Sequence, residues 1–427
     1  MKVLIVGGGG REHAIALKIK ENPEVTALYA APGNGGIAQI ATCLPFKATD
    51  VDGIVRWAAE NKVDFVIVAP DDPLCLGMVD ALAAQGIPAF GPRKNAAIIE
   101  GSKVFSKNLM KKYGIPTAAY ETFDDYDAAV KYLQTADMPI VVKADGLALG
   151  KGVLICPDRE SAVEAVASMM KEAKFGASGA RVVIEEFLTG PEVSVLAFTD
   201  GKTVKPMVSS MDHKRALDND EGLNTGGMGT IAPNPCYTPE LAQRCMDEIF
   251  LPTIAAMNAE GRTFTGCLYF GLMMTPKGPK VIEYNCRFGD PETQVVLPLL
   301  KSDLLTIMRA TVDGTLADTP VEFAAGAACC VVLASGGYPV SYKSGYPISG
   351  LDEAGKTATV FHAGTKLIDG QIVTAGGRVL GVTATADTLE AAIDKAYRAA
   401  DKITFTDMHM RRDIGQRALA SRKESHS

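Results

Sequence analysis

The first 22 residues, MKVLIVGGGGREHAIALKIKEN (1–22), decide the fold class of the start of this chain. An apolar run over residues 2–6 predicts a buried strand, four glycines predict a tight loop, and the spacing over 11–22 predicts a helix. Strands that alternate with helices in this way predict βαβ units around a parallel sheet. The alternation continues with apolar runs at 26–30, 63–69 and 87–91 and helical patterns at 51–62 and 73–86.

Composition limits the class of protein. A chain of 427 residues exceeds one ordinary core, so about two to four domains are expected. The formal net charge is −7 and no long Lys/Arg run is present, which argues against a nucleic-acid partner. The nine cysteines are scattered without zinc spacing, as in a reducing cytoplasm. No window approaches the roughly 18 apolar residues of a membrane span, and the first apolar run is too short for a secretory signal. We therefore expect a cytoplasmic protein with small-molecule partners and no membrane.

The first glycine loop raises the question of a dinucleotide. A dinucleotide loop needs a small residue at its third position, but counting from Gly7 or Gly8 gives the bulky Glu12 or His13. The following strand also ends in YAAPGNGG (29–36), without the acid that holds ribose. A single phosphate at the helix N-terminus remains open, as do simple tight turns. Together with the APDDPL loop (69–74), these loops are predicted at the carboxyl edge of the sheet, where ligands bind.

The chain changes character after about residue 114. Apolar runs now come in pairs, at 140–156, 181–198 and 264–285, and each is interpreted as a strand pair. The middle of the chain is therefore predicted to be α+β with antiparallel strands. From about 325 onward, further strands precede a helix over 387–401.

A second glycine-rich loop, ADGLALGKGV (144–153), is the better phosphate candidate. Its glycine spacing is not that of a Walker A loop, and a strand rather than a helix follows it. A hairpin loop that folds over phosphates fits, with Lys143 and Lys151 supplying positive charge. A plain hairpin is the alternative. In VIEEFLTGPE (183–192), backbone groups could read an adenine edge, although Glu185 and Glu186 could also be a solvated strand end.

The stretch KVIEYNCRFGDPETQ (280–294) predicts a metal site. In a strand, Glu283 and Asn285 project from the same face. Two oxygen ligands suit Mg²⁺ whose other ligands are waters and ATP phosphates. Arg287 could then stabilise a phosphorylated intermediate, and Asp290 could bind an amine. His213, by contrast, is predicted to be structural.

The chain contains, in order, GGGGREH, APGN, KADGLALGKGV, EEFL, DHKR, NTGGMG, EYNCRFGDPETQ, FHAGT and GGRVL. This series resembles the glycinamide ribonucleotide synthetase family of the ATP-grasp superfamily over nearly the whole chain. The resemblance implies an N-terminal parallel βαβ (pre-ATP-grasp) domain over 1–102. It implies a two-lobed ATP-grasp domain over 103–320, with a lid at about 116–188, and a small β-rich C-terminal domain over 325–422.

The resemblance also implies the reaction. ATP, glycine and 5-phosphoribosylamine would give ADP, phosphate and glycinamide ribonucleotide, through a glycyl phosphate, as the second step of de novo purine synthesis. Mg²⁺ or Mn²⁺ would assist, and the enzyme would be a monomer or a weak homodimer. Phosphorylation makes chemical sense because a carboxylate resists nucleophiles and its oxygen leaves poorly.

By resemblance, each site residue receives a role. The metal ligands would be Glu283 and Asn285, and the catalytic residues Arg287, Asp290, Lys214 and Asp212. Asp212 and Asp290 would face the glycine ammonium, and Arg287 its carboxylate. The residues of the phosphoribosylamine site would be Gly10, Asn34, Asp71 and Arg378. The ATP-binding residues would be Lys103, Lys143, Gly146, Gly150, Lys151, Gly152, Glu185, Glu186, Phe187, Leu188 and Glu192.

Two departures and three alternatives stay open at this point. The family usually has Gly-Pro-Glu where this chain has Ala69-Pro70-Asp71, and Ile37 replaces a hydroxyl residue. Both departures bear on phosphoribosylamine binding. The alternatives are another ATP-grasp carboxylate–amine ligase, a non-catalytic nucleotide-binding regulator and an NAD-dependent oxidoreductase.

Overall fold

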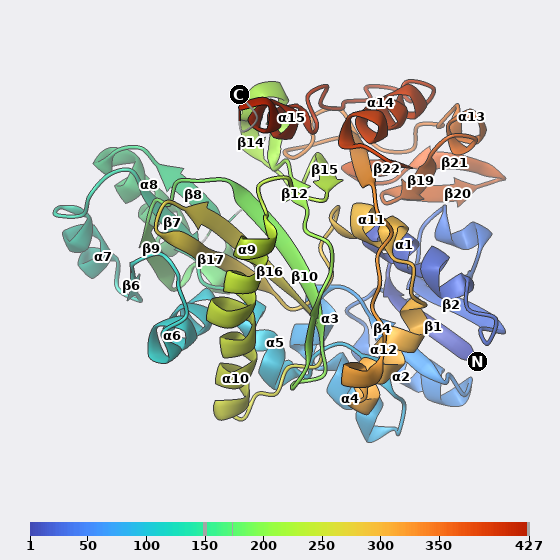
Figure 1. Cartoon of the computed structure of the whole chain (residues 1–427), viewed down its shortest axis with the longest axis horizontal. Helices are drawn as coiled ribbons and strands as arrows, with labels where there is room; N and C mark the ends of the chain where they lie inside the picture. Colours follow the sequence, from blue (N-terminus) through green and yellow to red (C-terminus); the bar gives the residue numbers. More distant parts are fainter. Residues whose placement is uncertain (148–151, 173, 425–427) are drawn as a thin grey trace.

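The computed structural model of this chain describes residues 1–147, 152–172 and 174–424. Figure 1 shows, at one end, a small sheet within residues 120–186, which we call the lid sheet. The long strands β10 (Glu192–Thr199) and β16 (Gly266–Thr275) lie in the centre, and the first and last parts of the chain lie together at the other end. Helix α1 (Gly10–Lys20) packs directly against the C-terminal strand β19 (Thr359–His362). The start and the end of the chain therefore form one side of the molecule.

The N-terminal sheet is parallel throughout, in the order β3-β2-β1-β4-β5. Its central strand is fully buried over Val3–Val6, which is why it reads as a continuous apolar run. The predicted βαβ alternation is confirmed. The strands are β1 (Lys2–Gly7), β2 (Ala27–Pro32), β3 (Thr42–Cys43), β4 (Phe65–Val68) and β5 (Ala89–Phe90). The helices that follow α1 are α2 (Val51–Glu60), α3 (Asp71–Leu76) and α4 (Met78–Ala84).

Helices α5 (Lys94–Gly101) and α6 (Lys103–Tyr113) lead into the lid. Ser102 caps α6, because its Oγ accepts a hydrogen bond from the backbone N–H of Phe105. The lid sheet has the order β6-β9-β7-β8 and its own apolar core, built by α7 (Tyr126–Leu133) and α8 (Arg159–Met170). Its strands are β6 (Tyr120–Phe123), β7 (Ile140–Ala144), β8 (Val153–Cys156) and β9 (Val182–Glu186).

The central sheet is antiparallel, in the order β11-β10-β16-β17. The predicted hairpin at 264–285 is confirmed as β16 (Gly266–Thr275) and β17 (Gly278–Asn285). The predicted strand pair at 181–198 is wrong, because β9 belongs to the lid and β10 (Glu192–Thr199) to the central sheet. The segment between them connects the two lobes. Also in this lobe are β11 (Val204–Pro206), α9 (Pro239–Cys245) and α10 (Leu251–Ala259).

The C-terminal sheet has the order β12-β15-β18-β22-β19, and α14 (Leu389–Ala400) packs on it. Its strands β12 (Met211–Asp212) and β15 (Gly229–Ala232) come from the middle of the chain. The exact domain limits stay a prediction. The remaining strands are β13 (Arg215–Leu217), β14 (Glu221–Asn224), β18 (Ala327–Ala334), β20 (Thr365–Ile368), β21 (Gln371–Thr374) and β22 (Arg378–Ala386). The remaining helices are α11 (Thr293–Val296), α12 (Leu304–Asp313), α13 (Leu351–Gly355) and α15 (Gln416–Glu424). Within the described residues, none of the helices has the length and apolar character needed to cross a membrane.

Candidate active site

A cleft of about 700 Å³ lies between the lid, β17 and the C-terminal sheet. It collects most of the residues that the sequence singled out, from segments far apart in the chain. Gly150 and Lys151 lie outside the described residues. The predicted residues that line the cleft are Asp71, Lys103, Lys143, Gly152, Glu185, Glu186, Phe187, Leu188, Glu192, Asp212, Lys214, Glu283, Asn285, Arg287, Asp290 and Arg378.

The Glu12 side chain occupies the space inside the first glycine loop, residues 7–10. The Glu12 carboxylate accepts a hydrogen bond from the backbone N–H of Gly9 at 2.7 Å, and Arg11 Nε lies 2.7 Å from its other oxygen. A Cβ at Gly7 would lie 2.6 Å from the Glu12 side chain. The Glu12 carboxylate thus accepts from the Gly9 backbone N–H, a donor that the phosphate of a dinucleotide would need. The geometry agrees with the sequence argument against a dinucleotide at this loop.

The lid side of the cleft carries a buried cluster of charge. Glu185 Oε1 lies 2.5 Å from Lys143 Nζ, and Glu185 Oε2 lies 2.8 Å from Lys107 Nζ. Burial opposes ionisation, but the two ammonium groups hold the pKa of Glu185 below its ordinary value. Burial also lowers the pKa of Lys107 to about 8. The sequence predicted Glu185 as a nucleotide contact, whereas here its carboxylate oxygens pair with Lys143 and Lys107.

The neighbouring predicted contacts have different surroundings. Lys103 Nζ donates to the Gly146 carbonyl at 3.1 Å, so helix α6 touches the phosphate-loop candidate. A Cβ at Gly146 would lie 2.5 Å from Ser178 Oγ, so the position needs glycine. Glu186 is exposed and pairs with Lys280 at 2.9 Å. Phe187 is 38% exposed on the cleft wall, which offers an aromatic face to a planar ligand.

Strand β17 presents Glu283 and Asn285 on one face. Gly271 lies opposite Glu283 across the β16–β17 ladder, and a Cβ there would lie 3.0 Å from the Glu283 side chain. Lys214 Nζ lies 3.7 Å from Glu283 Oε1. Burial raises the pKa of Glu283, but Lys214, Lys143 and other cations outweigh it and keep the net shift downward. The pair is an ionised carboxylate and an amide oxygen, and these donors fit a hard cation.

Arg287 is fixed by an acid that the sequence did not reveal. Its Nη2 lies 3.0 Å from Glu100 Oε1, and Glu100 Oε2 accepts a hydrogen bond from the backbone N–H of Cys286 at 2.7 Å. Arg287 Nη2 also donates to Asn285 Oδ1 at 3.3 Å. Among the described residues, the buried Nε of Arg287 has no hydrogen-bond partner. One donor of this guanidinium is therefore unpaired and buried, while the residue as a whole lines the cleft.

Two acids, the buried Glu292 and the half-buried Asp212, line the other side of the cleft. Burial raises the pKa values of both Asp212 and Glu292, and the charge of Glu292 raises the pKa of Asp212 further. Glu292 Oε1 accepts a hydrogen bond from the Tyr269 hydroxyl at 3.1 Å. Asp212 Oδ1 accepts one from the backbone N–H of His213 at 2.7 Å. A cationic ligand between them would relieve the repulsion.

Asp290 is tied to three parts of the chain. Its carboxylate accepts hydrogen bonds from Gln294 Nε2 at 2.8 Å and from the backbone N–H of Arg11 at 3.3 Å. Arg378 Nη2 lies 3.7 Å away, and its Nη1 donates to the Asp290 and Gly226 carbonyls. Burial opposes ionisation, but Arg378 and Arg11 keep the pKa of Asp290 below its ordinary value. This carboxylate joins the N- and C-terminal parts at the cleft.

Two predicted substrate contacts are not among the residues that line this cleft. Asn34 Nδ2 donates to the Gly8 and His362 carbonyls, at 2.9 and 2.8 Å, and its Oδ1 accepts from Gly36 and Ile37. Both ends of this amide are therefore occupied by backbone groups, of the two N-terminal glycine loops and of β19. Gly10 begins α1, and a Cβ there would lie 2.5 Å from Gln294 Nε2.

Sequence reasoning missed the roles of Glu100, Lys107 and Tyr269. Lys107 had a usable signal, since it lies one helical turn from Lys103 and shares its face of α6. Glu100 and Tyr269 carry no such signal in the sequence, because the residues that they contact are distant in the chain.

Family models match this chain along most of its length. They are the N domain of phosphoribosylglycinamide synthetase over residues 1–100, its ATP-grasp (A) domain over 101–293 and its C domain over 328–417. A phosphoribosylamine–glycine ligase of Halalkalibacterium halodurans is 48% identical, covering 100% of this chain and 99% of that protein. A phosphoribosylamine–glycine ligase of Allochromatium vinosum is 49% identical, covering 98% of this chain and 99% of that protein.

Solved structures agree. The crystal structure of a phosphoribosylamine–glycine ligase from Thermotoga maritima has a TM-score of 0.86 and 35% identity, covering 97% of this chain and 100% of that one. A biotin carboxylase structure from Campylobacter jejuni has a TM-score of 0.73 and 15% identity, covering 96% of this chain and 93% of that one. At this identity, the likeness shows a shared fold alone.

Proposed function

Because the chain belongs to the phosphoribosylglycinamide synthetase family and is an ATP-dependent phosphoribosylamine–glycine ligase of purine biosynthesis, we propose how its cleft performs that reaction. The γ-phosphate of ATP passes to the glycine carboxylate, and the amine of 5-phosphoribosylamine then displaces phosphate from the glycyl phosphate. The protein's task is to position these groups and to stabilise charge.

The observation that carries this proposal is the environment of Glu283. This ionised carboxylate shares a strand face with Asn285 and faces Lys214 at 3.7 Å, with Lys143 and Lys103 nearby. Glu283 and Asn285 would hold Mg²⁺, or Mn²⁺ in its place. A cation held there would supply positive charge that offsets the negative charge of the ATP phosphates. Lys143 and Lys103 would face the phosphates, with Phe187 against the base.

We assign glycine to the space between Arg287 and the Asp212–Glu292 pair. The guanidinium of Arg287, which lines the cleft and is held in place by Glu100, would donate to the glycine carboxylate and later to the acyl phosphate. The raised pKa values of Asp212 and Glu292 support an ammonium ligand there, because its positive charge would offset their repulsion. Asp290, predicted as an ammonium ligand, would instead position Arg378 and Arg11.

The amine substrate would enter on the side of Asp71 and Arg378, which line the same cleft. We place the enzyme in the cytoplasm, which the nine free cysteines support. The test of the whole proposal is ADP release with ATP, glycine and phosphoribosylamine generated in the assay, each omitted in turn. ADP release that needs both glycine and the amine supports it. Release that is indifferent to glycine contradicts it.

A further inference from the structure

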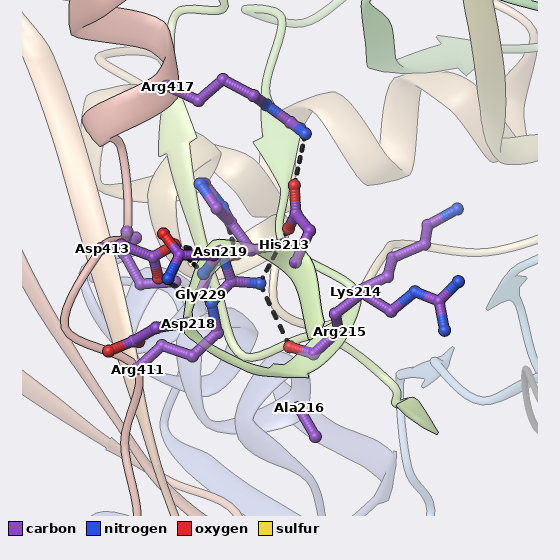
Figure 2. Close-up of polar contacts among 12 residues, drawn as sticks. His213, Lys214, Arg215, Ala216, Asp218, Asn219, Gly229, Arg411, Asp413 and Arg417 are labelled. Carbon is purple, nitrogen blue, oxygen red and sulfur yellow. Dashed lines mark hydrogen bonds and ion pairs between the residues drawn. The ribbon is translucent and has the colours of Figure 1, made fainter. Parts of the chain in front are cut away.

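We propose that Arg411 and His213 are positioning residues for the reaction, because they fix the backbone on both sides of Lys214 and so hold its ammonium group beside Glu283. The inference rests on the proposed role of Lys214 in the cleft. It concerns two segments: the 213–229 loop, which carries Lys214, and the C-terminal arm, residues 409–417. Figure 2 shows the contacts between them.

Arg411 is the centre of these contacts. Its side chain is 1% exposed, yet it lies on no wall of the cleft. Nε and Nη2 each donate to an oxygen of Asp413 at 2.8 Å, while Nη1 donates to Asp220 Oδ1 at 3.0 Å and to the Arg215 carbonyl at 3.1 Å. Burial opposes ionisation of Asp413, but Arg411 lowers the pKa of that acid to about 2. Arg411 and Asp413 are therefore both charged at neutral pH.

The tip of the 213–229 loop depends on this cluster. Asn219 and Asp220 both have left-handed backbones, with φ of 60° and 56°, which side chains other than glycine seldom adopt. The backbone N–H of Asn219 donates to Asp413 Oδ2 at 2.9 Å, and Asp218 accepts from the backbone N–H of Arg412 at 2.7 Å. The arm thus holds the tip of the loop in this left-handed conformation, which Asn and Asp tolerate better than most side chains.

His213 makes the second attachment. Its Nε2 accepts a hydrogen bond from the backbone N–H of Gly415 at 3.1 Å, so its Nδ1 carries the proton and donates to the Gly229 carbonyl at 3.1 Å. Burial lowers the pKa of His213 to about 4, which agrees with this neutral form. The ring is enclosed between the arm and β15, as expected of a structural histidine.

Lys214 lies between these two attachments. The residue before it is held by Gly415, and the carbonyl of the residue after it is held by Arg411. The side chains of Lys214 and Arg215 extend away from Arg411 (Figure 2), and Lys214 Nζ lies 3.7 Å from both Glu283 Oε1 and Glu192 Oε2. An error of about 1 Å in this position can cost roughly a hundredfold in rate. A buried guanidinium outside the cleft can therefore control the chemistry inside it.

The alternative is that Arg411 only stabilises the fold. A double-mutant cycle separates the two explanations, because groups that act as a unit are not additive. We would measure kcat per folded enzyme and melting temperature for Arg411→Met, Lys214→Met and the double variant. Arg411→Lys tests whether a positive charge alone restores the function of Arg411. Arg412→Ala is the matched control, because the Arg412 side chain pairs with Asp401 at the surface.

We expect Arg411→Met to lower kcat about tenfold or more in the wild-type background and less than about twofold in the Lys214→Met background. Arg412→Ala should behave as wild type. Equal losses in both backgrounds would overturn the inference while leaving the proposed function intact. An unchanged kcat in Lys214→Met would remove the proposed role of Lys214 and the inference with it. If Arg411→Met does not fold, Asp220→Asn, at a partly exposed partner of Arg411, takes its place in the same cycle.

Discussion

Glu100 Oε1 lies 3.0 Å from Nη2 of Arg287, although the two residues belong to different parts of the fold. The same carboxylate accepts the backbone N–H of Cys286 at 2.7 Å. It therefore fixes both the side chain and the backbone at the end of β17, next to Asn285. The guanidinium that we assign to the glycine carboxylate is thus oriented from α5, the helix that leads out of the N-terminal sheet.

Glu100→Gln keeps an acceptor for Cys286 but removes the charge opposite Arg287. We expect kcat to fall by about 10- to 100-fold with little change in the KM for ATP, because Arg287 would stabilise the acyl phosphate in the proposed reaction. Steady-state kinetics with melting curves check this result. Glu24→Gln, at an exposed pair with Arg309, is the control and should be neutral. A raised KM for ATP with an unchanged kcat would contradict the assignment.

Lys107→Met leaves Glu185 with Lys143 as its only ionic partner among the described residues. Removing one partner of a buried ion pair costs about 3–5 kcal/mol, so the variant should melt at a lower temperature and bind ATP more weakly. Calorimetry and nucleotide titration measure the two effects. Lys112→Met, at an exposed pair with Glu260, is the matched control. Wild-type ATP affinity in Lys107→Met would show that Glu185 needs no second cation.

Glu283→Gln keeps the shape of the side chain and removes its charge. The metal concentration that gives half-maximal activity should rise and kcat should fall at least about a hundredfold, because the remaining amide is a weak ligand for Mg²⁺. Titration with Mg²⁺ and with Mn²⁺ measures both quantities. Glu248→Gln, at a surface pair with Arg244, is the control. An unchanged metal requirement would exclude Glu283 as a ligand.

The raised pKa values of Asp212 and Glu292 predict a pH dependence with a definite sign. Both acids bind protons more tightly in the folded state, so the ligand-free enzyme should lose stability as pH rises above the ordinary carboxyl range. In the proposed site, glycine binding would need the ionised forms of these acids, so kcat/KM for glycine should fall as pH falls through their raised pKa values.

Glu292→Gln tests this coupling. Without the charge of Glu292, Asp212 should ionise at a lower pH, so the acid limb of the kcat/KM profile for glycine should shift to lower pH. The ligand-free enzyme should also melt at a higher temperature at neutral pH. Melting curves and pH profiles of variant and wild type provide the data. An acid limb that stays in place would show that the two carboxylates do not interact.

Local patterns predicted a large share of this fold. The alternation in the first hundred residues and the turn between β16 and β17 are signals carried by neighbouring residues. The period of two in a strand was enough to place Glu283 and Asn285 on one face. The bulk of Glu12 and His13 was enough to argue against a dinucleotide loop.

Long-range pairing could not be predicted in this way. The TGP sequence before β10 looks like a hairpin turn, but β9 and β10 pair with strands of different sheets. The contact of Arg411 with the Arg215 carbonyl joins residues 196 positions apart, and no local periodicity encodes it. Buried charges such as Glu100 resemble surface residues in the sequence, because only the folded chain supplies their partners.

The most direct test of the account follows the oxygen atoms of glycine. The enzyme would be supplied with ATP, phosphoribosylamine and glycine labelled with ¹⁸O in its carboxylate, and the inorganic phosphate would be analysed by mass spectrometry. If ATP activates the carboxylate as glycyl phosphate, each phosphate released carries one glycine oxygen. Phosphate without label, at full turnover to product, would contradict the account.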